Sequence, residues 1–66
     1  MTKKYAVDLI SPCVILDKRT QREVTIDYIN DETPYPGKLL LVGYFQDDGE
    51  EFNRLFDQDS IVRLVE

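Results

Sequence analysis

The side chains best suited to chemistry in this sequence are carboxylates, and they gather in one region. Between positions 47 and 59, six carboxylates accompany one arginine, whereas the rest of the chain carries equal numbers of acidic and basic side chains. Paired carboxylates perform acid–base catalysis only where a pocket desolvates one of them and shifts its pKa. A chain of 66 residues has little interior beyond its own side chains. We therefore expect no enzyme, no catalytic residue and no cofactor.

The densest acidic stretch surrounds Gly49 and consists of Asp47, Asp48, Glu50 and Glu51. At the tip of a hairpin these side chains would form a negative prong that engages a basic surface on a partner protein. The alternative is a solvated turn whose charges keep a sheet edge soluble. A calcium loop needs alternating oxygen ligands and a late glutamate over about 12 residues, which this spacing does not supply. We therefore expect no metal site.

Tyr35 is the second candidate for binding, because a proline stands on each side of it. Such a ring loses little conformational entropy on binding and suits an interface anchor. It could equally fold back to cap the core. A basic cluster at Lys18, Arg19 and Arg22 could touch an anion, but neighbouring acids favour a plain solvated loop.

Several functions are disfavoured by composition. The chain has no histidine and one cysteine, Cys13, which lies in an apolar run and is expected to be an inert core thiol without a disulfide. Net charge is −5 and no basic patch stands out, so direct nucleic-acid binding is not expected. Asp8 interrupts the first residues too early for a signal peptide, and no apolar run approaches the roughly 18 residues of a membrane span. We expect a cytoplasmic protein that does not bind membranes.

The element that must position these groups is the apolar run 39–45, which the sequence predicts to be a central strand. Both of its alternating faces are apolar, so we expect it to be covered on both sides. Gly43 in mid-strand predicts a bend or bulge. Pro36-Gly37 before the run favours a type II turn, and Asp48-Gly49 after it favours a type I′ hairpin turn.

The remaining strands are weaker in pattern. We expect strands at 5–10, broken by Ser11-Pro12, at 13–16, at 22–29 and at 61–65, with Val24, Ile26 and Tyr28 on one face of the third. Residues 51–56 fit either a strand or a helix, and we favour the strand because a central strand needs a neighbour. The polar corner 57–60 could hold one turn of 3₁₀ helix.

Taken together, the pattern predicts an all-β fold: a small, strongly bent antiparallel barrel of the SH3-like type, with five or six strands and room for one short helical turn near 50–60. Residues 1–66 are expected to form one domain.

The closing segment 56–64, together with 24–28 and 41–45, resembles SH3-like and Sm-like barrels and, more faintly, the WYL-type ligand-sensing module. The resemblance covers about two-thirds of the chain and follows its hydrophobic pattern. It implies a small barrel fold. The arginines that WYL-type modules present toward ligands or nucleic acid are missing near the central strand, so no functional residue carries over.

We therefore expect a non-enzymatic, acidic interaction module that binds a basic protein partner through the acidic hairpin, as an accessory or inhibitory factor of the kind phages and mobile elements make. One alternative is a nucleic-acid mimic that acts on a DNA- or RNA-binding protein. Another is a small ligand-sensing or nucleic-acid-binding barrel. Exposed edge strands would also permit a homodimer.

Overall fold

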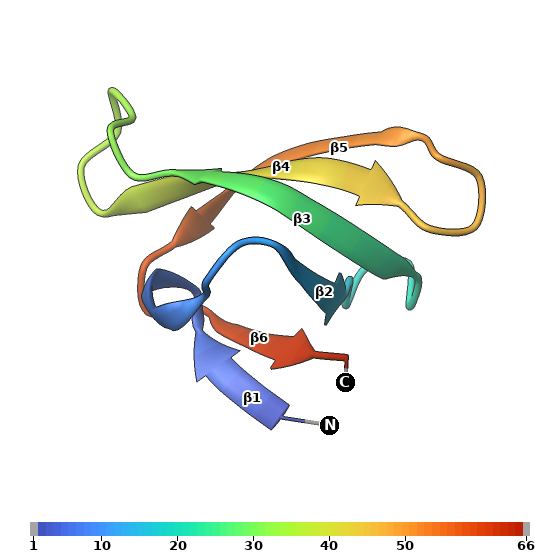
Figure 1. Cartoon of the computed structure of the whole chain (residues 1–66). Coiled ribbons are helices and arrows are strands. Elements are labelled where there is room, and N and C mark those ends of the chain that lie inside the picture. Colours follow the sequence, from blue (N-terminus) through green and yellow to red (C-terminus); the bar gives the residue numbers. More distant parts are fainter. Residues whose placement is uncertain (1, 66) are drawn as a thin grey trace.

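In the computed structural model, which describes residues 2–65, one antiparallel sheet curls into a half-barrel (Figure 1). Its order is β1-β6-β2-β3-β4-β5. The all-β, strongly bent fold is therefore confirmed. In the described part of the chain the strands are Thr2–Tyr5 (β1), Cys13–Leu16 (β2), Glu23–Asn30 (β3), Lys38–Phe45 (β4), Glu51–Asp57 (β5) and Ile61–Leu64 (β6).

The bend of the sheet is concentrated where β3 passes Gly43 of β4. The pairing register of these strands shifts between Ile26 and Tyr28, which leaves Asp27 as the extra residue of a bulge. Gly43 pairs with Ile26 at this point, and a Cβ atom added to it would lie 1.8 Å from the carbonyl oxygen of Thr25. Only glycine permits so close a backbone approach. The predicted bend at Gly43 is confirmed.

The bulge also changes which residues of β3 face the core. Val24 and Ile26 are fully buried, whereas the Tyr28 side chain is 56% exposed. The extra residue shifts the alternation of side chains by one position, so Tyr28 points out of the half-barrel. The prediction that Tyr28 shares a face with Val24 and Ile26 is therefore wrong.

The core fills the concave side of the sheet. β4 contributes Leu39, Leu41 and Phe45 to it, and these side chains pack with Ile15 of β2 and Val62 of β6 in one buried cluster. The alternate residues of β4 are only half-buried or exposed. The expectation that both faces of β4 are covered is wrong, because within residues 2–65 the curl encloses only the concave face.

The first strand is shorter than predicted. β1 ends at Tyr5, and a 3₁₀ turn, η1, follows at Ala6–Asp8. The Ala6 amide donates to Ser60 O at 2.8 Å and the Val7 amide to Gln58 O at 3.0 Å, which seats this turn on the corner before β6. The predicted strand at 5–10 is therefore wrong.

The segment that follows the acidic turn after β4 is extended. β5 at Glu51–Asp57 confirms the strand that we favoured over a helix. The short helical turn expected near 50–60 is wrong, since the 3₁₀ turn of the described residues lies at Ala6–Asp8 instead.

β4 is preceded by one turn and followed by another. Gly37 has φ 76°, and the Lys38 amide donates to Tyr35 O at 3.1 Å, as the predicted type II turn requires. After β4 the predicted two-residue type I′ turn is wrong. The Phe45 amide donates to Glu50 O and the Gly49 amide to Phe45 O, which leaves a four-residue loop with positive φ at Gly49 alone.

Replacing Gly43 by alanine tests the close approach. We expect Gly43→Ala to lower the free energy of unfolding by about 3 kcal/mol or more, because the methyl group would meet a backbone carbonyl held in the sheet. Gly37→Ala is the matched control. It meets no atom within 4 Å and should cost only about 1 kcal/mol for its positive φ. Urea unfolding followed by circular dichroism measures both variants, and equal losses would contradict the account.

Candidate functional site

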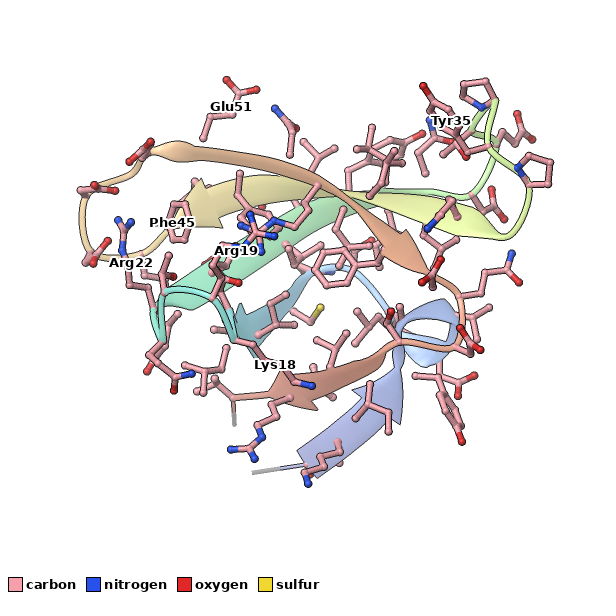
Figure 2. The ribbon with its side chains drawn as sticks, turned by 180° about the vertical axis from the view of Figure 1, so that it is seen from behind. Lys18, Arg19, Arg22, Tyr35, Phe45 and Glu51 are labelled. Atoms are coloured by element: carbon pink, nitrogen blue, oxygen red, sulfur yellow. The ribbon has the colours of Figure 1, made fainter. Side chains whose placement is uncertain are left out.

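The predicted acidic prong is partly neutralised by Arg22. Its guanidinium donates to Asp47 through Nε at 2.9 Å and through NH2 at 2.7 Å, and lies 3.0 Å from Asp48 Oδ2. The same group lies 3.9 Å from the centre of the Phe45 ring, a cation–π contact. Figure 2 shows Arg22 and Phe45 close together at this end of the sheet. The hydrogen bonds between Arg22 and Asp47 raise the pKa of Arg22 and lower that of Asp47.

The four acids of the hairpin tip therefore differ in role. Asp47 binds Arg22, and Asp48 both contacts Arg22 and accepts the Glu50 amide at 2.8 Å, so these two side chains hold the loop together. Glu51 accepts a hydrogen bond from Asn53, and neither Glu50 nor Glu51 has an ion-pair partner among residues 2–65. The charge available to a partner is centred on Glu50 and Glu51.

Tyr35 lies at the opposite end of the sheet from Glu51 of the acidic tip, as Figure 2 shows. Its side chain is 56% exposed, so it does not cap the core. Thr33 fixes the loop around it: the Thr33 hydroxyl donates to Tyr35 O at 2.9 Å and accepts the Tyr35 amide at 3.3 Å. The structure does not bring Tyr35 and the acidic tip together.

An apolar surface on the convex side of the sheet lies between these two ends. We call it the outer face; its residues are Tyr28, Leu40, Val42, Tyr44 and Leu55. They are neighbours by strand register: Tyr28 stands beside Val42, Leu40 beside Leu55, and Tyr44 beside Glu51. Tyr28 is 56% exposed, and Tyr44 and Leu55 are each 41% exposed.

The sequence pattern did not reveal the outer face, because it depends on the bulge that turns Tyr28 outward and on the absence of a covering layer over β4 in residues 2–65. The available signal is the apolar character of both faces of 39–45, from which the sequence predicts burial on both sides. Such a strand is also compatible with a surface that another molecule covers.

The buried carboxylate of Asp17 is another feature that the sequence did not reveal. It accepts hydrogen bonds from Arg54 NH1 at 2.7 Å, from the Thr20 hydroxyl at 2.8 Å and from the Arg19 amide at 3.2 Å. Burial raises the pKa of Asp17, but these hydrogen bonds outweigh it and hold the pKa below its ordinary value. The ion pair between Asp17 and Arg54 joins the β2–β3 loop to β5.

The remaining candidates are quickly placed. Cys13 packs against the core and burial raises the pKa of its thiol, as expected for an inert core cysteine. Residues 2–65 contain no cluster of three potential metal ligands. Over the same residues, no helix is long and apolar enough to cross a membrane.

Comparisons of the chain with protein-family models, with curated proteins and with solved structures returned no match. The resemblance to WYL-type modules therefore stays a prediction. The proposed function therefore depends on the outer face and the acidic tip.

The Asp17–Arg54 pair predicts acid sensitivity. Because the folded-state pKa of Asp17 lies below its unfolded value, the carboxylate stabilises the fold above the unfolded pKa, and this contribution is lost as pH falls through the folded pKa. Asp17→Asn should lower the free energy of unfolding at pH 7 by about 2 kcal/mol. Its loss of stability between about pH 5 and pH 2 should be smaller than that of the natural chain.

Urea unfolding at a series of pH values measures this difference. Asp59→Asn, at the exposed corner before β6, is the matched control and should behave as the natural chain does. Thr20→Ala removes one hydrogen bond to Asp17 and gives a milder variant that should lose about 1 kcal/mol. Parallel pH profiles for Asp17→Asn and the natural chain would contradict the role of the pair.

Proposed function

We propose that this chain is a non-enzymatic protein-interaction module that binds a partner through the outer face and the adjoining acidic tip. The observation that carries the proposal is the apolar outer face, on which Tyr28, Tyr44 and Leu55 are exposed and Leu40 and Val42 are half-buried. Contiguous exposed apolar surface on a small protein commonly marks an interaction site. Tyrosine is also among the residue types that contribute most to binding energy at interfaces.

The charges around the outer face support a basic partner. Glu51 stands beside Tyr44 at one end, and Asp57 lies on the same side of β5 at the other. Lys38 is the cation on this face among the described residues of β3, β4 and β5, and it already forms an ion pair with Asp57. A partner with an apolar centre and a basic rim would complement this arrangement.

The same charges disfavour a second copy on the outer face. Two outer faces packed with their acidic tips together would bring Glu50 and Glu51 of both copies close to one another, and like charges at an interface oppose association. The homodimer allowed by the sequence is therefore not the occupant that we propose.

The length of the surface limits the shape of the partner. β4 has eight residues, so the outer face extends about 25 Å from the acidic tip toward the Tyr35 loop. A helix of about 17 residues covers that length. Tyr35, held in a hydrogen-bonded loop, would provide an anchor at the far end.

Nucleic-acid mimicry is less well supported than protein binding. A mimic needs a row of free negative charges, and Arg22 already neutralises part of the acidic tip through Asp47 and Asp48. We further propose an SH3-like type for the half-barrel and a cytoplasmic location, which its free cysteine suits.

Pull-down from the native host, quantified by mass spectrometry, tests the proposal. The natural chain should capture a protein with a basic surface. Tyr28→Ser/Leu55→Ser and Glu50→Lys/Glu51→Lys should each reduce that capture about tenfold or more, since they remove exposed apolar anchors and tip charge without touching core or ion-paired residues.

Two controls match these changes elsewhere on the surface. Val7→Ser/Ile10→Ser removes exposed apolar side chains away from the outer face, and Asp8→Lys/Asp59→Lys reverses two exposed charges at η1 and at the corner before β6. Capture unaffected by the outer-face variants, or equally reduced by the controls, would overturn the proposal. Displacement of the partner by DNA would point to mimicry instead.

A further inference from the structure

The concave side of the half-barrel opens into a cleft that the proposed interaction surface does not use. β5 is an edge of the sheet, and β6 pairs with β2 only at Arg63 and Leu64, so within residues 2–65 the half-barrel is open between β5 and the first residues of β6 (Figure 1). A cleft of about 420 Å³ lies there, bordered by β2, β5, β6 and the loop after β2. That volume is in the range of small-molecule sites, which span about 300–1,000 Å³.

The floor of the cleft is apolar. Ile15 and Val62 are buried core residues, and Phe56 is a half-buried ring that packs against the core. Ile61 adds an exposed apolar edge. A hydrocarbon group on this floor would cover apolar surface that is otherwise open to water, which favours binding.

The walls of the cleft are basic, although the chain as a whole is acidic. Lys18, Arg19 and Arg54 line it, and within residues 2–65 Asp17 is the one acidic residue that lines it. Figure 2 shows Lys18 and Arg19 on the same side of the molecule, with Lys18 over β6. Among residues 2–65 neither Lys18 nor Arg19 has an ion-pair partner. The local charge therefore favours an anion.

The polar wall is also fixed in place before any ligand arrives. The Asp17 carboxylate accepts a hydrogen bond from Arg54. The Asp17 amide donates to Arg22 O at 2.9 Å, and the Gln21 amide donates to Asp17 O at 2.7 Å. These two backbone hydrogen bonds close the loop that carries Lys18 and Arg19. Asp17 is saturated with donors, while Arg54 keeps further N–H groups for a ligand. Preorganised donors lower the entropy cost of binding.

A second groove, beside β1, is less suitable. Lys3, Lys4 and Tyr5 line it, and all are exposed. It has neither a buried apolar floor nor a side chain fixed by a buried partner, so it lacks the features that distinguish the cleft between β5 and β6.

We propose that the cleft between β5 and β6 binds a small amphipathic organic anion, with its hydrocarbon part on Phe56 and Val62 and its acid group between Lys18, Arg19 and Arg54. This site is independent of the proposed interaction surface. Arg54 and Phe56 lie on the concave side of β5, whereas Leu55 between them lies on the outer face.

NMR titration of the ¹⁵N-labelled chain with decanoate, kept below its micelle concentration, tests the proposal. Amide shifts should appear at residues 16–19, 54–56 and 61–62. Decanol has the same chain length without the charge. It should bind at least about tenfold more weakly than decanoate, because it cannot form the charge-assisted hydrogen bonds. Decyl phosphate is the second anionic probe, and tighter binding than decanoate would assign a phosphate head group.

Matched variants separate the cleft from general surface charge. Lys18→Gln/Arg19→Gln should weaken decanoate binding about tenfold while leaving the Asp17–Arg54 pair intact. Lys3→Gln/Lys4→Gln makes the same change of charge at the second groove and should leave binding unchanged. Absence of shifts with both anions, equal binding of decanol, or equal effects of the two variants would overturn the proposal. None of these outcomes depends on the outer-face partner.

Discussion

The shape of this protein depends on one constraint, the close approach of the β3 and β4 backbones at Gly43. A Cβ atom on Gly43 would lie 1.8 Å from the Thr25 carbonyl oxygen, so only glycine lets the two paired strands come this close. Next to this point, the bulge at Asp27 bends β3. The sheet then curls enough for one face to enclose a core. Within residues 2–65 the opposite face has no covering layer, and the half-barrel is open between the edge strand β5 and the first residues of β6.

Two arginine–aspartate pairs hold this curled sheet together near the β2–β3 loop. Each guanidinium lies over a phenylalanine, Arg22 over Phe45 and Arg54 over Phe52, and the two rings meet edge to face at 5.5 Å. The pairs differ in surroundings, since the Asp17 side chain is 3% exposed and that of Asp47 is 60% exposed. Water screens the exposed pair, so the buried pair is the one expected to matter for stability.

Local chemistry made part of the fold predictable from the sequence. Pro36-Gly37 predicts a type II turn, because proline and glycine favour the backbone angles of its two central positions. Gly43 predicts the bend, because a glycine within a strand often marks a bulge or a close backbone approach. The outward direction of Tyr28 could not be predicted, since it depends on where the pairing register shifts. The burial of Asp17 was equally hidden, because its partner Arg54 stands 37 residues away and only the finished sheet brings them together.

The most direct test of this account measures which apolar side chains meet water. In dilute solution, a soluble paramagnetic agent should strongly relax the Tyr28 and Tyr44 ring protons and the Leu55 methyl groups, and leave those of Leu39 and Leu41 largely unaffected. That result would show that the curl at Gly43 separates a core from an uncovered apolar face. Similar protection of both sets in the monomer would contradict it.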